Sequence, residues 1–135
     1  MIIMKEAFDF LKQHKEVAFA TVSGNRPFIR VFQVMKIEGT TLYFATSPKK
    51  EVYGQLQENP NVEILGMDGN ISVRMSGRMF FDVPMETQKE IYAANPILPD
   101  LYPTFDTLVY CRMNVKAIDY YDLTPRPPHI AHYDL

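Results

Sequence analysis

The residues best suited to chemistry lie in one stretch, LYFATSPKKEVYGQLQENP at 42–60, where a β-rich segment runs into a helical one. Ser47 suits the N-cap of this helix, and Pro48 suits its first position. Lys49 and Lys50 would then lie in the first turn, where free N–H groups and the helix dipole attract an anion. The stretch therefore predicts a phosphate site. An exposed lysine pair without a ligand is the alternative.

A second basic segment, NRPFIRVFQVMKI, carries Arg26 and Arg30. They are four residues apart, so they share one face of a predicted strand. If this strand pairs with 42–46 in a three-stranded meander, Arg30 lies close to the lysine pair. Its guanidinium suits a phosphate through two parallel hydrogen bonds, and the hydroxyls of Thr46 and Ser47 would add donors. Without a ligand, Arg30 would be an exposed arginine on a half-solvated strand.

The other chemically interesting side chains carry less weight. His129 and His132 form an H-x-x-H pair, but they lie in a proline-rich tail without a cysteine partner or a helix. We therefore expect this tail to pack against the protein, and we expect no metal site. Cys111 lies in the apolar run LVYCRM, which predicts a buried structural thiol. The methionines between 67 and 85 are typical of core and interface filler rather than of a haem ligand set.

The elements that must position these residues follow from hydrophobic periodicity and turn signals. Helices are predicted over 4–14, 48–58 and 85–94. Strands are predicted over 17–23, 28–37, 41–46, 62–67, 71–83 and 107–121. The segment 95–107 and the proline-rich tail are predicted to be irregular. Six strands, mostly in hairpin order, favour an antiparallel barrel with helices at its ends, and a sandwich is the alternative.

Composition sets the broad class of the protein. With 135 residues, 47% of them hydrophobic, the chain suits a single domain over 1–135. Its net charge of −2 gives no electrostatic reason to expect a nucleic-acid partner. No apolar run approaches the roughly 20 residues of a membrane span, and the first residues are unlike a signal peptide. We therefore expect a soluble, cytoplasmic protein.

The order of these segments is also familiar. The initial helix, then ATVSGNRPFIRVFQVMKIEGTTLYFATSPKKEVYGQLQENPNVEI, then ISVRMSGRMFF resembles the pyridoxamine 5′-phosphate oxidase-like family of FMN-binding split barrels. The similarity is strongest to the small stand-alone members associated with nitroimidazole resistance, and it spans about 5–120. It implies a mainly β (α+β) fold, a six-stranded antiparallel split β-barrel with flanking helices. It also implies a homodimer with FMN at the interface.

Matching by motif assigns site residues as the resemblance implies them. One strand would lie along the flavin, the next would face its ring and ribityl chain, and a lysine would bind its phosphate. A further strand would come from the partner subunit or form the cleft wall. The strand along the flavin would carry Arg30, Val31, Phe32 and Gln33, and the strand that faces the ring and ribityl chain would carry Phe44, Ala45, Thr46 and Ser47. The phosphate-binding lysine would be Lys50, with Lys49 as second choice. The strand from the partner subunit or the cleft wall would carry Ser72 and Arg74.

The resemblance implies an FMN-dependent oxidoreductase that passes reducing equivalents, taken from NAD(P)H, to a small acceptor. A non-catalytic flavin-binding or sensing dimer and a haem-binding split barrel are the alternatives. Oxidation of pyridoxamine phosphate is not expected, because the tail PRPPHIAHYDL does not match the arginine- and histidine-bearing segment that binds this substrate in the longer members. The sequence indicates no catalytic acid or base.

Overall fold

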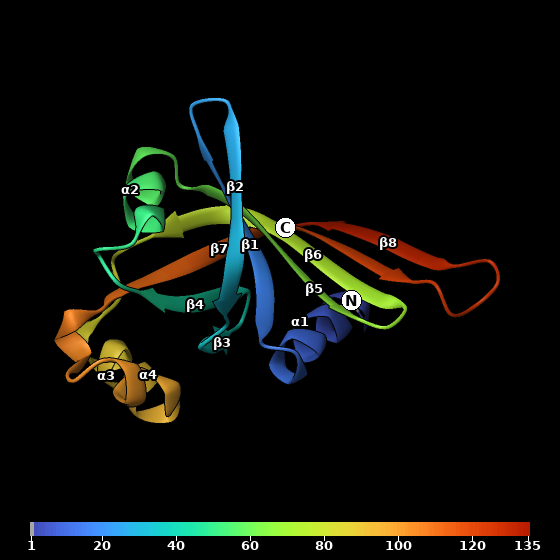
Figure 1. The fold of residues 1–135 in the computed structure, drawn as a ribbon. Coiled ribbons are helices and arrows are strands. Elements are labelled where there is room, and N and C mark those ends of the chain that lie inside the picture. The colour runs from blue at the N-terminus through green and yellow to red at the C-terminus, as the bar shows by residue number, and fades with distance from the viewer. Residues whose placement is uncertain (1) are drawn as a thin grey trace.

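The computed structural model describes residues 2–135, which form one eight-stranded β-sheet with short helices around it (Figure 1). The strands are β1 (Glu16–Ser23), β2 (Arg26–Gln33), β3 (Lys36–Glu38), β4 (Thr41–Thr46), β5 (Asn61–Asp68), β6 (Ile71–Phe80), β7 (Val109–Asp122) and β8 (His129–Asp134). The helices are α1 (Ile2–Gln13), α2 (Glu51–Glu58), α3 (Met85–Ala94) and α4 (Ile97–Leu101), with a 3-10 turn, η1, at Phe105–Thr107. Within 2–135, no helix has the length and apolar character needed to cross a membrane.

The sheet curls into a barrel that does not close. Its strands follow the order β2-β1-β5-β6-β7-β4-β3, with β8 paired to the far half of β7, and every pairing is antiparallel. β2 and β4 approach each other, since the rings of Phe32 and Phe44 lie 5.9 Å apart, but no ladder joins these strands among the described residues. The structure is therefore the predicted α+β split barrel, and the split lies between β2 and β4.

The strand count differs from the predicted six because two segments behave differently. The predicted strand 28–37 breaks at Val34, whose N–H donates to the carbonyl of Lys15 at 2.8 Å, and at Met35, whose N–H donates to the carbonyl of Tyr43 at 2.8 Å. These bonds move the chain from β1 to β4 and create the separate strand β3. The tail, predicted to be irregular, forms β8 because β7 is long enough to pair with it over 117–122.

The predicted meander is also wrong in its pairing. β2 pairs with β1 over its whole length, whereas β4 pairs with β7 on one side and with the short β3 on the other. Any contact between Arg30 and the lysine-bearing segment must therefore cross the split or pass through α2. It does not come from neighbouring strands of a ladder.

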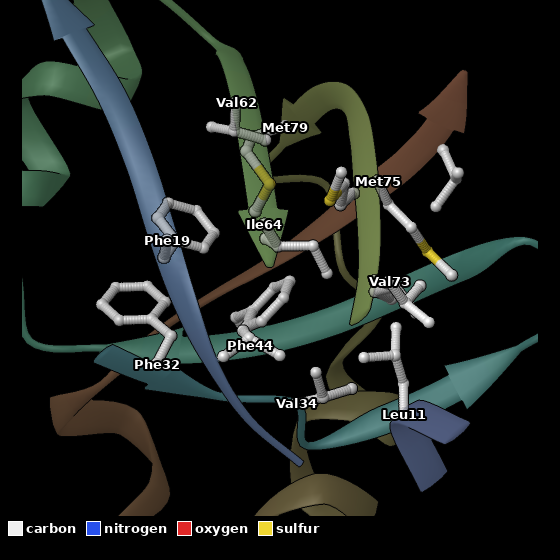
Figure 2. Close-up of a cluster of buried hydrophobic side chains, with 14 of the residues drawn as sticks. Leu11, Phe19, Phe32, Val34, Phe44, Val62, Ile64, Val73, Met75 and Met79 are labelled. Atoms are coloured by element: carbon white, nitrogen blue, oxygen red, sulfur yellow. The ribbon is translucent and has the colours of Figure 1, made fainter. Parts of the chain in front are cut away.

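Alternation along the strands sends one set of apolar side chains into the barrel, where they form the main core (Figure 2). Phe19 stacks on Phe32 at 4.4 Å between ring centroids and meets Phe44 edge-on at 5.3 Å. Cys111 is fully buried in this core, and burial raises the pKa of its thiol to about 12, which confirms the predicted structural role. Gly77 is required at the β6 bulge, because a Cβ there would lie 2.1 Å from the carbonyl oxygen of Asn114.

The helices cover the openings of the barrel. α1 packs its fully buried Leu11 against Gly66, where a Cβ would lie only 3.2 Å from the leucine side chain. α2 lies over β1, near the split, and α3 and α4 cover a second apolar cluster beside β4 (Figure 1). The segment 95–107, predicted to be a loop, contains α4 and η1.

One surface of the sheet stays uncovered, and we call it the outer face. Cross-strand register aligns its residues in rows, for example Val31–Ala18–Leu65–Arg74–Asp119–His132. Six large apolar side chains on it are exposed: Ile29, Val31, Leu65, Met67, Tyr121 and Ile130. Ion pairs cross its centre, where Arg74 contacts Glu63 and Asp119, and His132 contacts Asp119 and Asp134.

Candidate functional site

A small cleft occupies the split between β2 and β4. Its volume is about 130 Å³. β2 forms one wall, the end of β4 forms the other, Lys50 lies where the chain enters α2, and α4 covers the remaining side. The lining residues are Val31, Phe32, Gln33, Met35, Ala45, Thr46, Lys50, Ile97, Leu98, Leu101 and Tyr102. Six of the twelve site residues predicted from sequence are therefore gathered in one place.

The walls of the cleft follow from strand alternation. Phe32 points into the barrel, where its ring lies 4.4 Å from that of Phe19 and 5.9 Å from that of Phe44 (Figure 2). Because Phe32 also lines the cleft, this core cluster forms the inner end of the cleft. Val31 and Gln33 point the other way, toward the outer face, and Val31 is 68% exposed. The cleft therefore opens onto the outer face at the free edge of β2.

The hydroxyl of Thr46 is the most informative atom of the cleft. Thr46 is 2% exposed, and its Oγ1 is the one buried side-chain nitrogen or oxygen without a hydrogen-bond partner among the described side chains. Leaving such a group unpaired costs about 1–3 kcal/mol. Because Thr46 also lines the cleft, its hydroxyl is a candidate hydrogen-bond partner for a ligand.

The lysine-bearing turn differs in detail from the prediction. α2 begins at Glu51, and Lys50 is its N-cap with extended backbone (φ −82°, ψ 147°), so Ser47 is not the N-cap and Pro48 is not the first helical residue. The Ser47 hydroxyl instead accepts from the N–H of Lys49 at 3.2 Å within a turn. Among the described residues, no side chain caps α2, so the positive end of its dipole stays available directly after Lys50.

Arg30 lies next to the cleft without lining it. Its Nη1 donates to Thr21 Oγ1 at 2.8 Å, and its Nη2 donates to Gln55 Oε1 at 2.7 Å. Burial lowers the pKa of this guanidinium, and the carboxylate of Glu51 partly opposes the shift. Gln55 and Glu51 belong to α2, so Arg30 reaches the lysine-bearing helix through side chains and not through the predicted strand pairing.

The remaining predicted site residues are spread more widely. The ring of Phe44 is fully buried in the core, so only its main chain can face a ligand. Lys49 is exposed outside the cleft lining. Ser72 and Arg74 lie on β6 at the outer face, where Arg74 donates to Asp119 at 3.0 Å. Ser72 and Arg74 therefore do not form the cleft wall within one protomer. The other predicted role, a contribution to the cleft of a partner subunit, stays a prediction.

Sequence reasoning missed Met35 and the residues that α4 contributes. The apolar spacing of Ile97, Leu98 and Leu101, directly after Pro96, is a one-turn helical signal that the neighbouring prolines obscured. Neither His129 nor His132 is among the lining residues of the cleft. His132 bonds Asp119 at 2.7 Å and Asp134 at 2.9 Å on the outer face, and the described residues contain no group of His, Cys, Asp and Glu side chains suited to a metal.

A larger hollow lies elsewhere, on the outer face near the β6 bulge. Its volume is about 640 Å³, and it is lined by small residues together with Glu63, Arg78 and Lys116. Despite its size, it contains no unpaired buried polar side chain among the described residues. The cleft at the split is therefore the better candidate for a specific ligand.

Comparison with known proteins agrees with this architecture. The model of the family described as pyridoxamine 5′-phosphate oxidase matches residues 3–94. The chain belongs to the pyridoxamine 5′-phosphate oxidase family. The matched region contains β2, β4, Lys50 and α2, and hence most of the cleft of this family member. No curated protein matches the sequence.

Solved structures extend the similarity over almost the whole of this family member. A NimC/NimA family protein from Clostridium acetobutylicum is 25% identical and superimposes with a TM-score of 0.82, covering 99% of this chain and 93% of that one. An FAD-binding protein from Mesorhizobium loti is 16% identical (TM-score 0.71; 84% and 90% covered). A heme-binding protein from Mycobacterium smegmatis is 13% identical (TM-score 0.75; 96% and 56% covered).

The cleft residues fit a flavin in chemical type. A flavin phosphate needs cationic and N–H donors, which Lys50, Arg30 and the start of α2 supply. A flavin ring needs an apolar slot with a few polar groups, and the cleft offers aliphatic side chains together with Gln33 and the unpaired Thr46 hydroxyl. With about 130 Å³, one protomer offers only part of such a slot.

Proposed function

We propose that the protein binds FMN at the split, with the flavin ring along β2 and the end of β4 and the phosphate toward Lys50 and Arg30. The observation that carries this proposal is the buried, unpaired hydroxyl of Thr46 in a cleft that Lys50 also lines. Membership of the pyridoxamine 5′-phosphate oxidase family and the fold shared with an FAD-binding protein add support.

The role we propose is that of an oxidoreductase acting on a small acceptor, with NAD(P)H as electron donor. Bound FMN would supply the two-electron redox chemistry. The chain itself would bind and orient the flavin and keep water from the ring, because Val31, Met35, Ile97 and Leu101 are aliphatic. Among the described lining residues, Lys50 and Tyr102 are the side chains that could donate a proton to a reduced acceptor.

We further propose a homodimer through the outer face. The six exposed apolar side chains of this face surround a band of ion pairs, an arrangement suited to a self-complementary interface. Val31 belongs both to this face and to the cleft, so a second copy packed there would extend the incomplete cleft. Ser72 and Arg74 of each protomer would then face the partner.

Sedimentation tests the dimer. We expect a dimer mass for the wild type and a shift toward monomer for Met67→Lys, which puts a charge on a 71% exposed side chain of the outer face. The matched control is Met85→Lys, on a 57% exposed methionine of α3, which should remain dimeric. A monomeric wild-type protein in the presence of FMN would rule the dimer out.

Titration with FMN tests the cofactor. Lys50→Ala should weaken FMN binding by about 1–3 kcal/mol, the scale of a lost charge-assisted hydrogen bond. Lys49→Ala is the matched control, because it removes the same charge one residue away and outside the cleft lining, and it should change affinity little. A protein that stays colourless after incubation with FMN would refute the proposal.

Turnover separates the enzyme from a non-catalytic flavin protein. We expect NADH or NADPH to bleach the bound flavin and an added quinone or nitro compound to restore its colour. Bound FMN that no donor reduces would leave a flavin-binding or sensing dimer. A Soret band after incubation with haem, with no FMN bound, would instead favour the haem-binding alternative that the Mycobacterium smegmatis structure represents.

A further inference from the structure

The guanidinium of Arg30 is fixed along one of its edges. Nη1 donates to Thr21 Oγ1 at 2.8 Å, and Nη2 donates to Gln55 Oε1 at 2.7 Å. The two acceptors also contact each other, because the Thr21 hydroxyl donates to the same Gln55 oxygen at 2.6 Å. Both acceptors therefore face the end of the guanidinium that carries Nη1 and Nη2. The guanidinium, the Thr21 hydroxyl and the Gln55 oxygen form a closed triangle of three hydrogen bonds.

The triangle is rigid because its acceptors have little freedom. Thr21 is 1% exposed on β1, and Gln55 is 5% exposed on α2. The amide of Gln55 has only one orientation that satisfies its surroundings: Oε1 accepts two hydrogen bonds, and Nε2 donates to Glu51 Oε1 at 3.3 Å. Arg30 is thereby tied to the helix whose N-cap, Lys50, lines the cleft.

Two N–H groups of Arg30 remain. A guanidinium has five, and three are used, the third by a 3.3 Å bond from Nη1 to the carbonyl of Phe19. Within residues 2–135, neither Nε nor the second hydrogen of Nη2 has an acceptor. These two lie on the same side of the guanidinium and point in parallel, which is the geometry that binds two oxygens of one phosphate.

We propose that Thr21 and Gln55 are positioning residues that present the Nε–Nη2 edge of Arg30 to the phosphate of FMN. This inference rests on the proposed function and deepens it by assigning phosphate selectivity to two buried neutral side chains that never touch the ligand. Without them, Arg30 would keep its charge but lose its fixed direction. Its two parallel hydrogen bonds to the phosphate would then have to be formed at the expense of side-chain entropy.

The test compares FMN with riboflavin, which carries the same ring and ribityl chain without the phosphate. The measured quantity is the ratio of the riboflavin Kd to the FMN Kd. Gln55→Met keeps the length of the side chain but removes the acceptor, and it should lower this ratio about tenfold through weaker FMN binding, while the riboflavin Kd changes little. Gln57→Met is the matched control on the exposed side of the same helix, and it should leave the ratio unchanged.

A second pair of variants guards against misfolding of Gln55→Met. Thr21→Val should lower the ratio, and Thr21→Ser, which restores the hydroxyl, should return it toward the wild-type value. A purely structural role would instead weaken both flavins in parallel, and that result would overturn the inference. A wild-type ratio near one would also overturn it while flavin binding stands, whereas a wild type that binds neither flavin would refute the proposed function as well.

Discussion

Replacing Thr46 with valine is expected to stabilise the unliganded protein and to weaken its binding of FMN. Threonine and valine have nearly the same shape, and both suit a β-strand, so the change removes little except the hydroxyl. That hydroxyl is 2% exposed and has no partner among the described residues. In the unliganded protein, valine therefore removes an unfavourable buried polar group and breaks no hydrogen bond among the described residues.

The expected change in stability follows from the free-energy cost of burying a polar group without a hydrogen-bond partner. Removing it should raise the free energy of unfolding by about 1–3 kcal/mol. For a chain of this length, we expect Tm to rise by roughly 3–10 °C. In the complex, the hydroxyl gains a partner, so valine should weaken FMN binding about 2- to 10-fold, the equivalent of one net hydrogen bond.

Thr21→Val is the matched control for stability. Thr21 is equally buried, at 1% exposure, but its hydroxyl donates to Gln55 and accepts from Arg30. The same substitution should therefore destabilise the protein by about 1–2 kcal/mol. The two changes thus have opposite predicted signs although they are chemically identical.

The assay is denaturant unfolding of each variant without flavin, followed by titration of Thr46→Val with FMN. Destabilisation of Thr46→Val as large as that of Thr21→Val would show that the Thr46 hydroxyl is satisfied in the folded protein. An unchanged FMN affinity would show that the ligand does not use it. Either result would refute the reasoning that links this atom to a ligand.

Three further predictions concern the scaffold. Gly77→Ala should destabilise the protein by roughly 3 kcal/mol or more, because its Cβ would lie 2.1 Å from a backbone oxygen. The control is Gly54→Ala in α2, whose Cβ would meet no atom within 4 Å and which should stabilise the protein by about 0.5–1 kcal/mol. Thermal unfolding of both variants measures the difference. Asp119 and Asp134 raise the pKa of His132, so its contribution to stability is complete below the unfolded pKa of 6.5 and is lost as the pH rises through the higher folded pKa. Denaturant unfolding at about pH 6 and about pH 9 should show this loss in the wild type and a smaller one in His132→Asn; equal pH dependence would contradict the assignment. Cys111 should resist a thiol reagent until the protein unfolds, since its pKa is raised to about 12 and it is fully buried; rapid labelling of the native protein would be inconsistent with that burial.

The fold was largely predictable where local pattern and tertiary structure agree. α3 begins and ends at the predicted residues, and β1, β4 and β5 lie within one residue of their predicted bounds at each end. These segments have clear alternation or helical periodicity, and turn residues separate them.

The parts that were not predictable depend on distant partners. The break at Val34 and Met35 exists because Lys15 and Tyr43 accept their N–H groups, and no local pattern reveals those acceptors. β8 exists because the far half of β7 offers a free edge to a proline-flanked tail. The start of α2 moved three residues because Ser47 closes a turn with Lys49 before the helix begins.

In the candidate site, too, the features that depend on distant partners were not predictable from the sequence. The residue types of the cleft, including Lys50 and Thr46, followed from the strand-to-helix junction and the family resemblance. That the Thr46 hydroxyl lacks a partner, and that Gln55 fixes Arg30, depend on how α2 packs over β1. Such facts belong to the three-dimensional arrangement, so no spacing rule can supply them.

A crystal structure of the protein grown with FMN tests the central claim most directly. We expect the flavin ring between residues 31–33 of β2 and the end of β4, a hydrogen bond from or to Thr46 Oγ1, and the phosphate within hydrogen-bond distance of Lys50 and of the Nε–Nη2 edge of Arg30. FMN located away from the split, or bound there with the Thr46 hydroxyl still unpaired, would contradict the account.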